Sequence, residues 1–209
     1  GLMSAGFFKD QADVNSSYRQ EFSTVSVGDV KYRDLNGDKV INEFDVTSLN
    51  GSTEIPELNY AFNIGVEYKG FGLNAWFQGT GNYMKYLPTM IWGGMANGNN
   101  LSVDYYNNCF DVAGDNALYP RLTTLENNNN SKASDIWYKN VHFLKMRNCE
   151  LYYKLPSKLL SKLWLSAAKV FVQGENLLSF DNVDAMDAEV LSTAYPMFKG
   201  VNVGVTLTF

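Results

Sequence analysis

The chain has 209 residues and a formal net charge of −5 at pH 7, with 45% hydrophobic and 14% aromatic residues. A sequence pI near 4.9 argues against a nucleic-acid partner, because phosphate binding needs clustered lysine and arginine. No run approaches the roughly 18 apolar residues of a membrane-spanning helix, and the cysteines are too few for a disulfide framework. Composition alone therefore indicates a soluble acidic globular domain, with a fold still to be read from the pattern.

Residues 34–45 have the spacing of a twelve-residue calcium loop, in which oxygen ligands recur at fixed positions. Position six is Lys39 instead of the usual glycine, and Asp45 is shorter than the usual closing glutamate. An Asx-rich turn without an ion would show a similar composition, so both interpretations stay open. We expect a structural Ca²⁺ ion here, held by the side chains of Asp34, Asn36, Asp38, Asn42 and Asp45 and the backbone carbonyl of Val40.

Residues 58–79 predict a β-hairpin. Apolar and polar residues alternate strictly along both halves, and only Lys69-Gly70 separates the halves. A two-residue turn keeps both apolar sets on one face, as the alternation requires. The apolar set is Tyr60, Phe62, Ile64, Val66, Tyr68, Phe71, Leu73, Ala75 and Phe77.

Long segments rich in asparagine and aromatic residues follow, at residues 80–137 and again at 179–198. Their aromatic rings could contact a substrate or a partner, or could pack within the loops, and the sequence does not choose between the two. The aromatic residues of the first segment and its border are Tyr83, Tyr86, Trp92, Tyr105, Tyr106, Phe110, Tyr119, Trp137 and Tyr138.

Three more strands are expected, at 140–155, 168–178 and 201–209. In the first of them Lys145 and Arg147 interrupt the apolar parity, which indicates either a bulge or a stretch beyond an apolar belt. The short connection 156–166 has room for one helical turn. The last strand alternates cleanly from Val201 to Phe209.

The expected strands run about ten residues, which matches a tilted strand crossing a bilayer better than an ordinary soluble strand of about five or six. Short and long connections alternate along the chain, as in transmembrane barrels with short periplasmic turns and long outer loops. If the C-terminus is periplasmic, both short connections lie on the periplasmic side. The pattern thus favours an antiparallel transmembrane β-barrel over a soluble β-sandwich with one buried face.

Several motifs resemble the SusC/RagA family of TonB-dependent outer-membrane transporters. The resemblance covers nearly the whole chain in the family's order, ending on the terminal strand. The residues that carry it are Gly28 to Asp38 and on to Asp45, Glu67 to Leu73, Trp76 to Gly79, Arg121 to Thr124, Phe143 to Pro156, and Val170 to Leu178 with Gly174-Glu175-Asn176-Leu177-Leu178.

The resemblance implies the C-terminal strands of a barrel of about 22 strands with an N-terminal plug. It further implies import of glycan oligosaccharides or peptides, driven by TonB through an N-terminal part missing from this chain, under a SusD-like surface lipoprotein. The terminal Phe209 would be the signal read by the barrel-assembly machinery. The start Gly1-Leu2-Met3 has no signal-peptide pattern, so we expect a piece of a longer protein that pairs with the rest of the barrel and plug.

We therefore expect an extracellular loop region at 1–57, with the calcium-type loop 34–45, and C-terminal barrel strands at 58–209 with the long loops 80–137 and 179–198. The expected location is the outer membrane of a Gram-negative bacterium, in contact with lipid and with the C-terminus periplasmic. The alternative is a secreted, calcium-stabilised β-sandwich that binds glycans. No catalytic set of residues is visible, so an enzyme is not expected.

Overall fold

The computed structural model describes residues 1–49, 54–87, 95, 98, 100–161, 164–183, 186–190 and 195–209. The chain forms two compact units. The first consists of Gly1–Ile55, Met84–Asn140 and Leu191–Thr193, and the second of Pro56–Tyr83, Val141–Val190 and Ala194–Phe209. The first unit thus combines the N-terminal region with the long segment between the second and third predicted strands.

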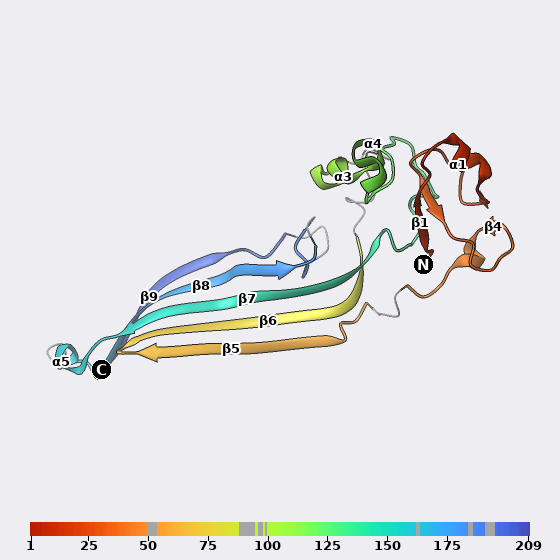
Figure 1. Ribbon diagram of the computed structural model, residues 1–209. Coiled ribbons are helices and arrows are strands. Elements are labelled where there is room, and N and C mark those ends of the chain that lie inside the picture. Colours follow the sequence, from red (N-terminus) through yellow and green to blue (C-terminus); the bar gives the residue numbers. More distant parts are fainter. Residues whose placement is uncertain are drawn as a thin grey trace. The chain divides into compact units, whose positions relative to one another are not determined.

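The second unit is built on one large sheet whose strands follow each other in chain order (Figure 1). The pairings β5–β6, β7–β8 and β8–β9 are antiparallel, and β6 hydrogen-bonds to β7. All five predicted strands are present, and β6 runs well past the expected end at residue 79. The strands are β5 (Leu58–Tyr68), β6 (Phe71–Tyr86), β7 (Tyr138–Lys154), β8 (Ala167–Asp181) and β9 (Gly200–Thr208).

The predicted hairpin turn is confirmed. Tyr68 pairs directly with Phe71, and the two residues between them, Lys69 and Gly70, have φ angles of 49° and 88°. Two consecutive positive φ values define the type I′ turn, whose twist matches that of the flanking strands. A side chain on Gly70 would place its Cβ 2.9 Å from the Lys154 carbonyl oxygen, so the turn also needs glycine for space.

Both short connections lie at the same end of this sheet as the C-terminus. The β7–β8 connection holds the expected helical turn, α5 (Ser157–Leu160), and Figure 1 shows it beside the C-terminus. Ala167 pairs with Thr208 there, and the Lys154 N–H donates to the Gly70 carbonyl oxygen at 2.8 Å. The long connections leave from the opposite end of the strands.

The interruption of the apolar parity in β7 coincides with a bulge. The β7–β8 register shifts between Met146 and Asn148. Opposite the shift, Asn176 has a φ of 50°, a left-handed conformation that asparagine tolerates better than most residues. The extra residue lies in β8, because the two steps from Met146 to Asn148 face the three steps from Leu178 to Glu175. A bulge is therefore present opposite Arg147, while a stretch beyond an apolar belt stays a prediction.

The first unit has a small mixed core. Strand β1 (Ser4–Phe7) pairs antiparallel with β3 (Val30–Tyr32), and β2 (Arg19–Gln20) pairs in parallel with β4 (Val40–Ile41). Leu2, Val30, Tyr32 and Ile41 form a buried cluster. The helical elements are α1 (Gln11–Ser16), η1 (Glu43–Asp45), α3 (Val103–Asn108), α4 (Phe110–Ala113) and η3 (Gly114–Asn116).

A buried polar cluster ties the two chain segments of this unit together. Asp29 is fully buried, and its carboxylate accepts hydrogen bonds from Arg121 Nε at 2.8 Å, Asn130 Nδ2 at 2.9 Å and the Ser26 N–H at 2.7 Å. Asn129 is also fully buried and donates to the Val30 carbonyl oxygen at 2.8 Å. Asn129 and Asn130, which lie in a segment expected to be a loop, therefore join that segment to β3.

Within the part of the chain that the structure describes, no helix has the length and apolar character needed to span a membrane. Both cysteines are free; Cys109 is buried and Cys149 half-buried.

Candidate functional site

One face of the large sheet is apolar and open. Paired residues such as Leu151 and Val172, or Val172 and Val203, lie on the same face because directly opposite residues in an antiparallel pair share a side. Val203 is 75% exposed. Single exposed apolar residues are ordinary, but a contiguous face of this kind marks an interaction with lipid or protein. Its exposed members include Tyr60, Phe62, Ile64, Val66, Tyr68, Phe71, Leu73, Leu151, Val170, Val172, Val201, Val203, Val205 and Leu207.

The soluble-sandwich alternative requires this face to be buried against a second sheet. All described strands of this unit belong to the one sheet, so the unit has no second sheet among its described residues to cover this face. The exposed face therefore argues against the sandwich.

The opposite face of the sheet is rich in amides. Asn63 pairs with Trp76, and Glu150 pairs with Gln173. Trp76 is 47% exposed, so an aromatic surface lies open among polar side chains. A shallow hollow of about 500 Å³ lies there, lined by Asn63, Asn74, Trp76, Asn148, Glu150 and Gln173. An open indole ring beside amide donors and acceptors can stack on a planar or ring-shaped group and hydrogen-bond to it.

Ion pairs lie on both sides of this hollow along the strands. Toward the short-turn end, Lys154 Nζ lies 2.6 Å from Glu67 Oε2 and Lys169 Nζ lies 2.9 Å from Glu150 Oε1. The first pair joins β7 to β5 across the intervening β6, and the second joins the neighbouring strands β8 and β7.

Toward the long-loop end, Lys145 and Arg147 of β7 hold the β8–β9 connection. The buried Lys145 ammonium pairs with Asp187 and lies 3.3 Å from Glu189 Oε2. Arg147 donates to Glu189 through both terminal nitrogens, at 2.8 and 2.5 Å, and through Nε to Gln78 at 3.0 Å. Sequence reasoning missed the partners Asp187 and Glu189; the only signal was two cations at positions where apolar residues were expected.

The calcium-type loop is closed by its own side chains. Asp34 accepts from the N–H groups of Gly37 at 2.6 Å and Lys39 at 2.9 Å. Asp45 reaches back to the start of the loop and accepts from the Leu35 N–H at 2.8 Å. Although burial opposes it, hydrogen bonds from the N–H groups of Asn42, Leu35 and Asn36 hold the pKa of Asp45 below its usual value. The last loop position therefore lies beside the first positions, as a cation loop requires.

The oxygen-rich donor set of this loop suits a hard cation. The sixth position, although it is a lysine, adopts the backbone conformation that a calcium loop has there. Lys39 has a φ of 68°, the left-handed conformation for which glycine is usual at that position. No group of three or more His, Cys, Asp and Glu side chains converges anywhere in the described ranges, so the carboxylates Asp34, Asp38 and Asp45 are not gathered as a ready shell. The calcium site stays a prediction.

The aromatic residues of the long segment mostly pack internally. The rings of Tyr105, Tyr119 and Trp137 stack in sequence, with centroids 5.0 and 5.9 Å apart, and all three are buried. Tyr105 donates to the Pro120 carbonyl oxygen and Trp137 to that of Asn130. Phe110 contacts Phe7, while Tyr106 is half-exposed. Trp92 lies outside the described residues.

Phe209 follows directly after β9 and is 86% exposed. Its expected role as an assembly signal stays a prediction.

Comparisons with known proteins agree with the resemblance predicted from the sequence. No family model matches the chain. TonB-dependent receptor P3 of Formosa agariphila is 26% identical over 160 residues, which is 76% of this chain and 15% of the receptor. The chain resembles SusC/RagA-type TonB-dependent transporters. The predicted resemblance is thus confirmed.

Solved structures support the same fold. The RagAB peptide importer in its open-open state matches all of this chain and 22% of the importer chain, with 19% identity and a TM-score of 0.68. The closed-closed state gives 18% identity over the same coverage and a TM-score of 0.68. Another structure of the RagAB peptide transporter matches 76% of this chain and 18% of that chain, with 22% identity and a TM-score of 0.61. At such identity these matches establish the fold only. The chain spans less than a quarter of the length of each of these proteins.

Proposed function

We propose that this chain forms strands and outer loops of a TonB-dependent importer in the bacterial outer membrane. The observation that carries the proposal is the sheet with one open apolar face and one amide-rich face. A strand needs about 9–11 residues to cross a bilayer. The strands β6, β7 and β8 have 16, 17 and 15 residues, enough to cross and to continue beyond it.

The sheet ends at β5 and β9, whose outer edges have no strand partner in the described part of the chain. In lipid each unpaired backbone group costs several kcal/mol, so spanning sheets close into barrels. We infer that the remainder of a barrel of about 22 strands, with its plug and TonB-contacting part, completes this sheet. The small share of each relative that this chain covers is consistent with that inference.

The connection lengths suggest the orientation. In outer-membrane barrels the short turns are periplasmic and the long loops are external. We propose that the Lys69-Gly70 turn, α5 and the C-terminus are periplasmic, and that the long connections face the outside. A SusD-like lipoprotein, implied by the family resemblance, would then contact the loops.

The substrate would be a nutrient of the glycan or peptide class. The neighbours are described as peptide importers, which favours peptides. The open Trp76 ring with its surrounding amides is compatible with either class, because both present planar or ring surfaces together with hydrogen-bonding groups.

Growth on defined nutrients tests this function. The gene for the full-length protein is deleted, and growth is compared on peptide mixtures and on oligosaccharide mixtures, with the intact gene restored as the control. We expect a defect on one class only, abolished uptake after removal of TonB, and the protein in the outer-membrane fraction. Equal growth on every nutrient, or a protein released into the medium, would contradict the proposal.

We also propose that residues 34–45 bind a structural Ca²⁺ ion through the ligands predicted above. The support is the closed loop and its oxygen-rich donor set. Calorimetric titration of the full-length protein should give binding heat that Asp34→Ala removes and Lys39→Gly strengthens, because glycine relieves the left-handed strain and removes a positive charge. No heat at millimolar Ca²⁺ would refute the site.

A further inference from the structure

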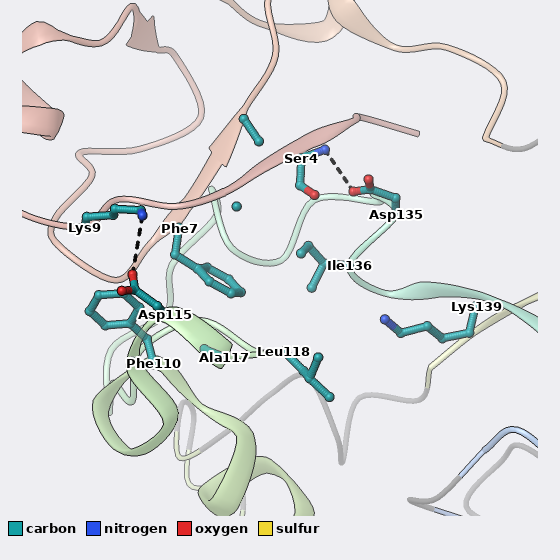
Figure 2. A pocket seen from close by; sticks show the side chains of 13 residues that line it. Ser4, Phe7, Lys9, Phe110, Asp115, Ala117, Leu118, Asp135, Ile136 and Lys139 are labelled. Carbon is teal, nitrogen blue, oxygen red and sulfur yellow. Dashed lines mark hydrogen bonds and ion pairs between the residues drawn. The ribbon is translucent and has the colours of Figure 1, made fainter.

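A pocket in the first unit has no role in the function proposed above. Its volume is about 280 Å³, at the small end of ligand pockets, and Figure 2 shows its lining. Phe7 comes from β1 and Phe110 from α4. Leu118 comes from the segment that follows η3, and Ile136 from the segment before β7. These apolar side chains form one part of the wall, polar and charged side chains form the rest, and the wall is assembled from four parts of the chain.

Hydrogen bonds fix each wall. The Ser4 N–H donates to Asp135 Oδ1 at 2.9 Å, which holds β1 beside the segment of Ile136. The Phe110 N–H donates to the Tyr119 carbonyl oxygen at 3.0 Å, and the Leu118 N–H donates to that of Asn108 at 2.9 Å. The rings of Phe7 and Phe110 meet edge to face, with centroids 6.3 Å apart. The pocket is thus a formed cavity with defined walls.

Lys139 extends toward the space between Ile136 and Leu118 in Figure 2. It is half-buried, and no carboxylate of the described residues forms an ion pair with it. Three other half-buried lysines do have such partners: Lys31 with Asp13 at 2.7 Å, Lys132 with Glu43 at 2.6 Å and Lys169 with Glu150 at 2.9 Å.

The surroundings disfavour the charged form of this lysine. Burial lowers the pKa of Lys139, although the charge of Asp135 acts in the opposite direction. The Asp135 carboxylate already accepts the Ser4 N–H. The other charged side chains of the lining, Lys9 and Asp115, face each other at 3.5 Å and neutralise each other. An anion entering the pocket would supply the counter-charge that Lys139 lacks.

We propose that this pocket binds a small monocarboxylate that carries one apolar group. The apolar group lies against Phe7, Phe110 and Leu118, and the carboxylate pairs with Lys139 Nζ. A neutral sugar would leave the ammonium without a counter-ion and would place hydroxyl groups against phenyl rings. A second anionic group would find only Lys9, which is already paired with Asp115. This inference does not depend on the proposed transport role.

Binding of matched probes to the full-length protein in detergent tests the site. The probes are 3-phenylpropionate and its uncharged analogue 3-phenylpropionamide, followed by calorimetry. We expect the acid to bind at least about tenfold more tightly than the amide, the gain typical of a charge-assisted hydrogen bond. Lys139→Met should remove that preference, and Lys139→Arg should restore most of it. Lys158→Met, at an exposed lysine of α5, is the matched control and should change nothing.

A chemical measurement does not depend on the folding of the variants. Trace acetylation of the wild-type protein, with and without probe, is read by peptide mass spectrometry at Lys139, with the exposed Lys158 as the internal reference. The acid, but not the amide, should protect Lys139. Absence of binding to the wild type, equal binding of acid and amide, or binding unchanged by Lys139→Met would each overturn the proposal.

Discussion

Buried charge is concentrated at one residue of the large sheet. Lys145 lies in β7 with almost no exposure, and its partners Asp187 and Glu189 belong to the β8–β9 connection. Burying an ammonium is costly unless it is paired, so the pairing and the position of the connection depend on each other. This cluster, together with the buried side chains of Val183 and Ala188, holds the connection on the sheet.

Replacing this lysine should therefore release the connection. Lys145→Met keeps an unbranched side chain of similar shape but leaves Asp187 without its cation, a loss of about 3–5 kcal/mol for a buried pair. We expect proteolytic cleavage within residues 182–199 of the folded full-length protein to become faster. Lys169→Met removes a more exposed pair and is the control. An unchanged cleavage rate for Lys145→Met would show that the cluster does not hold the connection.

The same cluster predicts a response to acid. Pairing with Arg147 lowers the pKa of Glu189. Burial opposes the effect at Asp187, but Lys145 and two backbone N–H groups hold its pKa below the usual value as well. A carboxyl group with a lowered folded-state pKa stabilises above its unfolded pKa, and this stabilisation is lost as the pH falls through the folded value.

The connection should thus be equally protected at pH 6 and pH 8 and should open below about pH 4, where unpaired carboxyl groups begin to protonate. Hydrogen exchange or an acid-active protease measures the opening. Loosening between pH 8 and pH 6 would instead indicate a different titrating group.

At the scale of elements, the sequence predicted the strands because alternation at period two is a local property. It placed the hairpin turn correctly, since Lys69-Gly70 is the only interruption between two alternating runs. It could not predict that β6 continues to Tyr86, where the apolar alternation no longer holds. Nor could it predict the Asp29–Arg121 and Asn129–Val30 contacts, because these join residues about a hundred positions apart.

The hairpin turn gives a prediction at this scale. Gly70→Ala introduces a Cβ at a φ of 88° and 2.9 Å from a carbonyl oxygen, so we expect a loss of about 1–3 kcal/mol. Gly65→Ala is the matched control, because its Cβ would have only an ordinary contact of 3.7 Å to Asn74. Urea unfolding of the full-length protein in detergent compares the two. Equal stability would contradict the strained turn.

At the scale of the whole molecule, the two faces of the sheet account for the composition. Nearly half of the residues are hydrophobic although the core of the described chain is small, because many apolar side chains lie on the open face. In the proposed barrel, the amide-rich face would line the aqueous interior. The acidic charge balance and the absence of long apolar runs fit this architecture as well as they fit a soluble domain.

Accessibility along β9 tests the membrane assignment most directly. Single nitroxide labels are placed from residue 201 to residue 206 of the full-length protein in liposomes, with Cys109 and Cys149 replaced by alanine. Labels at Val201, Val203 and Val205 should be relaxed by oxygen, which concentrates in lipid, and labels at Asn202, Gly204 and Thr206 by a water-soluble nickel reagent. Nickel access at all six positions, or no alternation between the two sets, would contradict the account.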